Sequence, residues 1–293
     1  MTEFFQQIVS GLASGGVYAS LALALVLIHR STQVINFAQG EMATFATYIA
    51  WTLIDRGMSY WPAFVLTLLV AFVGGVAVER VVIRPVERAP VLTVVMVTIG
   101  LLVLVNGAMA WLWSPEVKSF PSPFPSRAID VGGVAISLQD LGILGMTLVT
   151  LTLLYLFFRF TKVGLALRAA AVNPESSRLA GVRVSWMLAL GWGLAAMLGA
   201  VSGMMIAPTS FLEPNMMQVI IIYAFAAAVL GGINSPVGAV VGGLLLGVAL
   251  NLIGAYAEFL GPELRLPVAL AILLAVLLVR PAGLFERAVV KRV

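Results

Sequence analysis

One uninterrupted run of the chain, from Pro214 to Ala257, contains no charged residue. At about 1.5 Å per residue, a helical run of this length is sufficient for two crossings of the roughly 30 Å hydrocarbon core of a bilayer. The whole chain is 61% hydrophobic and only 10% charged, whereas a soluble domain carries about 25% charged residues. We therefore expect an all-α integral membrane protein, a polytopic helical bundle of about 8–9 transmembrane segments forming a single domain over residues 1–293.

Charged and proline-rich stretches divide the chain into apolar segments of membrane-spanning length. Residues 114–136 contain four prolines and predict a loop, because proline interrupts helices. The expected spans cover residues 8–28, 31–54, 61–78, 91–113, 137–158, 186–207 and 264–280, with two more crossings inside the charge-free run.

The charge-free run is itself interrupted by the sequence LGGINSPVG. The preceding apolar segment, residues 219–231, is short for a full span. Short apolar segments interrupted by glycine and proline are typical of broken helices beside a transport path. We therefore expect a broken or re-entrant helix here, marked by Gly231, Gly232 and Gly238, and leave open whether residues 219–231 cross the membrane fully.

The basic residues predict the orientation of the chain. With the N-terminus outside and nine crossings, thirteen of the 17 basic residues lie in segments on the inner side, as the positive-inside rule requires. That side then includes the C-terminal basic residues Arg280, Arg287, Lys291 and Arg292. Eight crossings would change some of these assignments.

The longest polar interruption is residues 159–185, here called the elbow, with five basic residues and a single acid, Glu175. Its local chemistry predicts two short helices, the first over about residues 162–172. Asn173 is a suitable N-cap for the second, with Pro174 at its first position and Gly181 as its end. Between two spans, this pattern indicates a shaped cytoplasmic surface on which a partner docks. A basic loop that only sets topology is the alternative.

A second polar run enters an apolar helix soon after the first span. Asn36, Gln39 and Glu41 are the residues of interest in it. A carboxylate at membrane depth costs about 3 kcal/mol on insertion scales, so such groups face protein or a water-filled path. These three residues are our candidates for the polar lining of a substrate pathway, although Glu41 could instead lie hydrated at the membrane interface.

Several classes of function lack the residues that they need. The chain has no cysteine, which excludes disulfides and thiolate metal sites. It has no phosphate-binding loop G-x-x-x-x-G-K-[ST], no H-E-x-x-H pair and no nucleophile elbow. We therefore expect no catalytic residues, no metal and no cofactor. The net charge of +4 does not indicate nucleic-acid binding, because the basic residues lie in short loops between apolar spans.

Three motifs extend over most of the chain. They are INFAQGEM at residues 35–42, the elbow pattern Gly164-x-x-x-Arg168-Ala169 followed by Ala180-Gly181, and AAAVLGGINSPVGAVVGGLLLG at residues 226–247. Together with GGVYASLALALVLIH near the start and VRPAGLF near the end, they resemble the permease subunits of bacterial high-affinity branched-chain amino-acid ABC importers. Gln39, Asn234 and Leu250 depart from residues that are frequent in that family, which bears on the substrate rather than on the type of subunit.

The resemblance implies a permease in the bacterial inner membrane that moves branched-chain amino acids, or a similar small solute such as an amide or urea, into the cytoplasm. In that family, two related permeases pair, ATPase subunits bind below them, and a solute-binding protein delivers the ligand from above. Gly164, Arg168, Ala180 and Gly181 would then couple the chain to the ATPase. The resemblance does not say whether the permease pairs with itself or with a paralogue. A stand-alone secondary carrier or channel with Glu41 as its coupling acid is the alternative.

Overall fold

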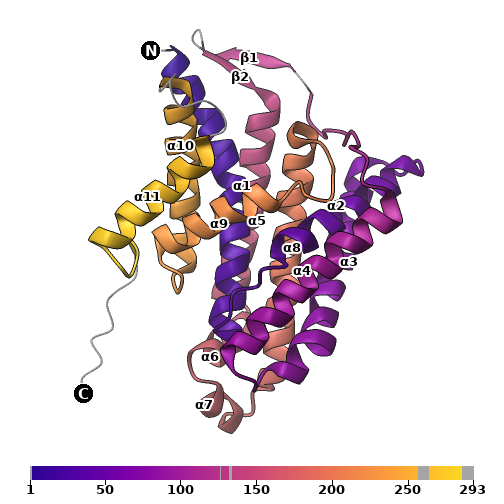
Figure 1. Cartoon of the computed structure of the whole chain (residues 1–293), viewed down its shortest axis with the longest axis vertical. Helices are drawn as coiled ribbons and strands as arrows, with labels where there is room; N and C mark the ends of the chain where they lie inside the picture. The colour runs from indigo at the N-terminus through magenta and orange to yellow at the C-terminus, as the bar shows by residue number, and fades with distance from the viewer. Residues whose placement is uncertain (1, 126, 132–133, 257–263, 286–293) are drawn as a thin grey trace. The chain divides into compact units, whose positions relative to one another are not determined.

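A computed structural model describes residues 2–125, 127–131, 134–256 and 264–285. Apart from the connecting loops and one small antiparallel pair of strands, these residues form helices (Figure 1). The first half contains α1 (Thr2–Thr32), α2 (Gln39–Asp55), α3 (Tyr60–Val78), the π-helix η1 (Glu79–Ile83), the 3-10 helix η2 (Arg84–Val86) and α4 (Val91–Trp113). The second half contains β1 (Ala128–Val131), β2 (Val134–Ser137), α5 (Leu138–Phe160), α6 (Lys162–Val172), α7 (Pro174–Leu179), α8 (Val184–Ser210), α9 (Gln218–Gly231), α10 (Pro236–Tyr256) and α11 (Arg265–Val279).

The lengths and composition of these helices confirm an all-α polytopic membrane protein. Within the described ranges, six helices are long and apolar enough to cross a membrane, namely α1, the continuous stretch from α3 through η2, α4, α5, α8 and α10. The helices α9 and α11 are apolar but shorter, and α2 has 17 residues. The expected segments therefore correspond to helices in the structure. Among the described residues, six of these helices have full spanning length.

Two details differ from the sequence expectation. Helix α1 continues past His29 and Arg30 to Thr32, because basic residues near a helix C-terminus are compatible with the helix dipole and do not end the helix. The proline-rich loop at residues 114–136 contains the strand β1 and most of β2, which pair with Ala128 opposite Ser137. Of the C-terminal basic residues, Arg287, Lys291 and Arg292 lie outside the described ranges.

The described chain forms two compact units. Unit 1 contains residues 1–26, 124–145 and 219–293, and unit 2 contains residues 27–123 and 146–218. The boundary between the two units passes through α1 and α5.

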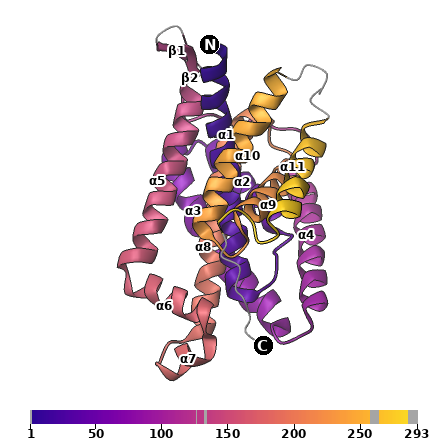
Figure 2. The same ribbon diagram turned by 90° about the vertical axis from the view of Figure 1, so that its left-hand side faces the viewer.

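In unit 1, α1 and α10 pack with their backbones in close approach, side by side in Figures 1 and 2. A Cβ atom placed on Gly15 would lie 2.9 Å from the carbonyl oxygen of Gly243, and one placed on Gly247 would overlap the backbone of Gly15. Small residues four positions apart permit this approach between helices in lipid. The side-chain amide of Asn251 donates to the backbone carbonyl of Gln7 at 2.9 Å and ties the same two helices together.

The glycine-rich interruption in unit 1 is a tight connection between α9 and α10. Helix α9 ends at Gly231, and Gly232 has a φ of +107°, a conformation that favours glycine. Gly238 lies so close to Gly231 that a Cβ atom on either residue would overlap the other's backbone. The amides of Leu284 and Phe285 donate to the carbonyls of residues 230 and 231 at 2.8 and 3.1 Å. The helical run is therefore broken at the expected position, and the C-terminal segment packs on the break.

Helix α8 is the centre of unit 2 and packs against both α2 and α3. Its buried face includes Trp192, which is 1% exposed. A Cβ atom on Gly193 would lie 2.8 Å from the Phe72 ring of α3, so the two helices approach at the small residues of α8. On the side of α2, the side-chain amide of Gln39 donates to the carbonyl oxygen of Ala195 at 2.9 Å.

Between α1 and α2 the chain loses helical structure. Gln33 has a φ of +57°, and the following residues Val34, Asn36 and Ala38 are buried. Irregular backbone at membrane depth is stable only where protein or a water-filled cavity surrounds it. Unit 2 therefore contains a second interruption, and α2 begins inside the unit.

The elbow adopts the two predicted helices, α6 and α7, at the lower end of Figure 1. The side-chain oxygen of Thr161 accepts from the amide of Gly164 at 2.9 Å and caps α6. The side-chain oxygen of Asn173 accepts from the amide of Ser176 at 2.9 Å and caps α7, as predicted. Helix α7 ends before Gly181, whose φ is +82°. Local capping residues thus set where α6 begins and where α7 begins and ends.

Candidate functional site

Glu41 is a buried acid in the first turn of α2 and is only 2% exposed. Its position at a helix N-terminus is electrostatically favourable for an anion. One carboxylate oxygen, Oε1, accepts no hydrogen bond. The described residues show an ion pair between Glu79 and Arg80 and none at Glu41. An ionisable group without a counter-ion inside a membrane protein is by default a candidate functional site.

Three amide side chains complete the surroundings of Glu41. Asn106 of α4 and Gln218 at the start of α9 lie within hydrogen-bonding reach of its carboxylate. Both also donate to the side-chain oxygen of Asn215, at 3.0 and 2.8 Å. We call Glu41, Asn106, Asn215 and Gln218 the amide cluster; all four belong to unit 2.

The amide cluster extends from the buried Glu41 to residues at the surface of unit 2. Asn106 is 15 residues past the start of α4 at Val91, which corresponds to about 22 Å of helix. Because Glu41 is within reach of Asn106, α2 begins near the level of the C-terminal half of α4. Asn215 and Gln218 are exposed, so a polar solute can reach the cluster from the surface. A buried carboxylate among amides is suited to a ligand that carries N–H donors.

The other two candidate lining residues, Asn36 and Gln39, form hydrogen bonds within the protein. The side-chain oxygen of Asn36 accepts from the amide of Ala38 at 3.1 Å, and its Nδ2 donates to the Gln39 side chain at 3.2 Å. Gln39 in turn donates to α8, and both residues are 0% exposed. These contacts shape the turn that leads into α2, whereas Glu41 retains an oxygen without a partner.

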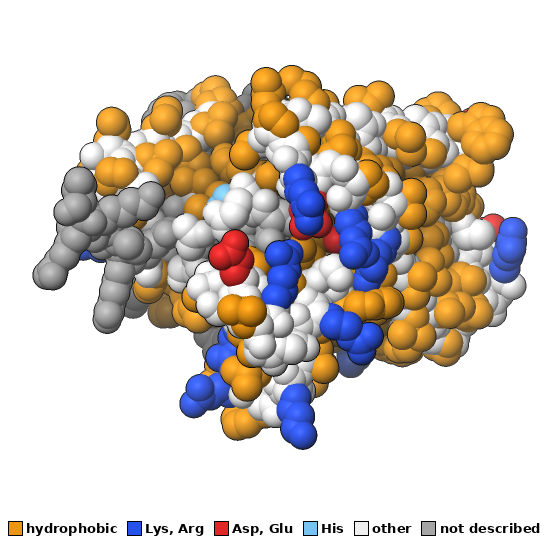
Figure 3. All heavy atoms as spheres, turned by 90° about the horizontal axis from the view of Figure 1, so that it is seen from below, with side chains coloured by type: hydrophobic (Ala, Val, Ile, Leu, Met, Phe, Trp, Pro, Cys, Tyr) orange, Lys and Arg blue, Asp and Glu red, His pale blue; other side chains and the backbone are white. Residues whose placement is uncertain are grey.

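The elbow presents apolar side chains to solvent between basic ones. Leu179 is 91% exposed and Val172 is 77% exposed. Figure 3 views the molecule from the end that carries α6 and α7, and Lys and Arg side chains gather there among hydrophobic ones. Isolated exposed leucines are common on protein surfaces. A nearly bare leucine on a short, well-capped helix would nevertheless stabilise a complex if a partner protein buried it.

The predicted coupling residues take different positions in the elbow. A Cβ atom on Gly164 would overlap the carbonyl of Phe157, so this glycine allows α6 to turn back against the end of α5. Arg168 is half-buried and lines a small cavity together with Arg30 of α1. Ala180 and Gly181 are exposed and end α7. The structure therefore places two of the four at the exposed end and two in the base of the elbow.

The sequence did not reveal Asn106, Asn215 or Gln218 as site residues, because each is far from Glu41 along the chain. A weak signal existed, since Asn106 is the only amide in the apolar helix α4 and the other two lie at the start of the charge-free run. Within the described residues, no group of three or more His, Cys, Asp and Glu side chains could hold a metal ion.

A bundle of apolar helices with broken segments, a buried carboxylate without a counter-ion and a capped basic elbow defines a polytopic membrane protein of the transport class. The chain belongs to the family described as branched-chain amino acid transport system, permease component, whose model matches residues 7–277. This family consists of transport components, not enzymes.

Individual relatives cover the full length of the chain. The high-affinity branched-chain amino acid transport system permease protein BraD of Pseudomonas aeruginosa is 32% identical over 305 residues, 99% of this chain and 98% of the relative. The corresponding protein LivH of Escherichia coli is 30% identical over 305 residues with the same coverage. A solved structure, PsaBC from Streptococcus pneumoniae in complex with Fab, overlaps with a TM-score of 0.49 and 12% identity over 92% of this chain and 89% of that chain. That overlap is too low to bear on the fold.

Proposed function

We propose that the chain is the membrane-spanning permease subunit of an ATP-driven importer that carries branched-chain amino acids, or a similar small amphipathic solute, into the cytoplasm. The observation that carries this proposal is the match of residues 7–277 to the permease family. The full-length relatives, which are permeases of branched-chain amino acid transport systems, support the substrate class. All described segments act as one transmembrane domain in the bacterial inner membrane.

The elbow faces the cytoplasm and receives the ATPase. Arg178 and Arg183 flank Leu179 in sequence, and positive charge of this density between spans favours the inner side. Leu179 and Val172 provide the apolar anchors, and the caps at Asn173 and Gly181 hold α7 in a defined shape. Gly164 and Arg168 support the base of the same surface. ATP-driven movement of the partner would pass through α7 to the helices of unit 2.

The amide cluster supplies the polar groups that contact the solute on its path through the membrane. Glu41 has an unsatisfied oxygen, and an amino acid carries an ammonium group with three N–H donors. Asn36 and Gln39 hold the turn that presents Glu41. The glycine break at Gly231, Gly232 and Gly238 is a point at which α9 and α10 can adjust during transport.

The proposed function implies three kinds of partner. They are ABC ATPase subunits on the cytoplasmic side, a second permease (a paralogue or a second copy of this chain), and an extracytoplasmic solute-binding protein. Labelling of Ser176→Cys from the inside and Ser122→Cys from the outside, in a chain that has no other cysteine, tests the orientation. Outside labelling of Ser176→Cys contradicts it.

The decisive experiment is uptake of radiolabelled leucine into proteoliposomes with and without the ATPase subunits and the binding protein. We expect ATP-dependent uptake only in the complete complex. Uptake by this chain alone, driven by an ion gradient, would contradict the proposal and favour a stand-alone carrier.

A further inference from the structure

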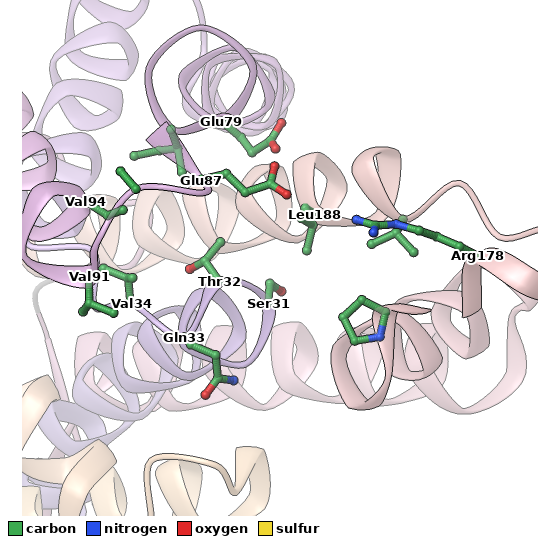
Figure 4. A pocket seen from close by; sticks show the side chains of 14 residues that line it. Ser31, Thr32, Gln33, Val34, Glu79, Glu87, Val91, Val94, Arg178 and Leu188 are labelled. Carbon is green, nitrogen blue, oxygen red and sulfur yellow. The ribbon is translucent and has the colours of Figure 1, made fainter. Parts of the chain in front are cut away.

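Unit 2 contains a cavity of about 210 Å³ that lies away from the amide cluster, at the elbow end (Figure 4). It is bounded by the end of α1, the η1–η2 segment, the start of α4, and residues of α7 and α8. We call it the Glu79 pocket. Pockets for drug-sized ligands occupy about 300–1,000 Å³, so this one is suited to a smaller molecule.

Glu79 supplies a buried charge in this pocket. The residue is 2% exposed, and its Oε2 accepts no hydrogen bond. The nearest cation is its neighbour Arg80, whose Nε lies 3.6 Å from that oxygen. The Arg80 guanidinium rests 4.0 Å above the ring of Trp186. Glu79 also begins the π-helix η1, and π-helical turns occur frequently at functional sites. The carboxylate thus has unused acceptor capacity toward the pocket.

Three further residues that line the pocket offer hydrogen-bond acceptors, namely Ser31, Thr32 and Glu87. The hydroxyl of Ser31 donates to the carbonyl of Leu27 at 2.8 Å, and the hydroxyl of Thr32 donates to the carbonyl of Ile28 at 2.9 Å. Both hydroxyl oxygens therefore keep lone pairs as acceptors, and both residues line the pocket. Glu87 adds a second carboxylate, which lies below that of Glu79 in Figure 4. Four acceptors with up to two negative charges match an ammonium group.

The remaining walls carry a cation and apolar side chains. Arg178 extends from α7 toward Glu87 in Figure 4. Its guanidinium forms no ion pair within the part of the chain that the structure describes, and guanidinium groups bind carboxylates in bidentate geometry. Ile83, Val94 and Leu188 are apolar residues of the pocket wall, and Leu188 lies between the carboxylates and Arg178 in Figure 4. The pocket therefore offers an anionic end, a cationic end and an apolar wall.

From this arrangement we propose that the Glu79 pocket binds a zwitterionic amino acid with an apolar side chain. The ammonium group contacts Glu79 and Glu87, the carboxylate contacts Arg178, and the side chain lies on Ile83, Val94 and Leu188. Because Arg178 and Pro174 belong to α7, a bound amino acid ties α7 to η1 and α4. Resting on the proposed function, the pocket thus lets imported amino acid on the cytoplasmic side slow further import.

Equilibrium binding of radiolabelled L-leucine to the purified full chain in nanodiscs tests the site. The Glu41→Gln background removes binding at the amide cluster. We expect competition by unlabelled leucine to exceed that of 4-methylpentanoate, which lacks the amine, and of isopentylamine, which lacks the carboxylate, by tenfold or more. Glu79→Gln and Arg178→Gln each weaken binding tenfold or more, whereas the control Glu175→Gln, on α7 but outside the pocket, leaves it unchanged.

The comparison of ligands in the Glu41→Gln background alone does not depend on how a pocket variant folds. Equal competition by isopentylamine or by alkali cations would show a simple cation site and overturn the proposal. Leucine binding that is unaffected by both pocket variants would overturn it as well.

The regulatory part is tested with the complete complex in proteoliposomes, by the ratio of initial uptake with and without leucine inside. We expect internal leucine to lower uptake several-fold in the wild type and this ratio to approach one in Glu79→Gln. A wild-type ratio of one contradicts the regulatory claim, while uptake without internal leucine separately tests the proposed function.

Discussion

The amide cluster and the elbow belong to the same compact unit. They differ in the type of residue that forms them and in how far apart these residues lie along the chain. The cluster combines a buried acid with amides that come from distant parts of the chain, Asn106, Asn215 and Gln218. The elbow uses only residues within a few positions of one another, and its most prominent side chain, Leu179, is apolar and almost fully exposed. An acid buried without a counter-ion is costly, and a nearly bare leucine stands out on the basic elbow. The difference indicates two separate tasks, contact with solute at Glu41 and contact with a protein partner at Leu179.

The largest effect is expected when charge enters the apolar tip of the elbow. Burial of a leucine side chain contributes about 1.5–3 kcal/mol, and Leu179→Glu both removes this contribution and buries a charge. The variant should weaken ATPase binding by about 100-fold or more, which co-purification at graded salt and ATPase concentration measures. Ser176→Ala, on the same short helix, is the control and should bind the ATPase normally.

Substitution inside the amide cluster should act on uptake. Glu41→Gln keeps the shape of the side chain but removes its charge, and hydrogen bonds to charged groups are worth about 1.5–3 kcal/mol. Because each 1.4 kcal/mol is a factor of ten, uptake per assembled complex should fall about tenfold or more. Glu116→Gln changes an exposed acid of the same unit and should have normal uptake. Wild-type kinetics in Glu41→Gln would remove this residue from the pathway.

A smaller effect is expected at the end of α7. Gly181 has a φ of +82° with no neighbouring atom within 4 Å of a Cβ position, so Gly181→Val costs backbone strain of about 1–2 kcal/mol and no clash. Solute-stimulated ATP hydrolysis should fall several-fold while membrane insertion is retained. Gly181→Asn is the matched control, because asparagine adopts the left-handed conformation with less strain than valine. Equal loss in both variants would attribute the effect to side-chain bulk.

The smallest effect concerns the start of the same helix. Asn173→Ala removes the hydrogen bond to the amide of Ser176, and loss of an N-cap costs about 1 kcal/mol of helix stability. Hydrogen exchange at the amide of Ser176 should become about fivefold faster, since 1.4 kcal/mol corresponds to tenfold. Asn173→Asp keeps the acceptor and should exchange at the wild-type rate. Unchanged exchange in Asn173→Ala would mean that α7 is held by packing instead of by its cap.

The same contrast explains what the sequence could predict. The bounds of α7 were predictable from Asn173, Pro174 and Gly181, since caps act over one helical turn. The interruption at Gly231 and Gly232 was also predictable, because glycine and proline interrupt a helix locally.

The surroundings of Glu41 were not predictable in this way. Its partners are between 65 and 177 positions away along the chain, and nothing in a local pattern specifies such contacts. The hairpin of β1 and β2 also escaped prediction, because its short strands follow a stretch dominated by prolines. Gln39 also makes a contact that its local sequence did not predict, since its amide joins α2 to α8.

The central claim is that solute contact and partner docking are separate in this chain. The direct test purifies Glu41→Gln and Leu179→Glu complexes side by side and measures two quantities for each, the amount of ATPase retained and the leucine uptake per assembled complex. We predict that Glu41→Gln retains the ATPase at the wild-type level and loses uptake. Leu179→Glu should lose the ATPase and, in the complexes that still hold it, transport normally. If Glu41→Gln releases the ATPase, or if Leu179→Glu retains it fully, the division of tasks between the amide cluster and the elbow is wrong.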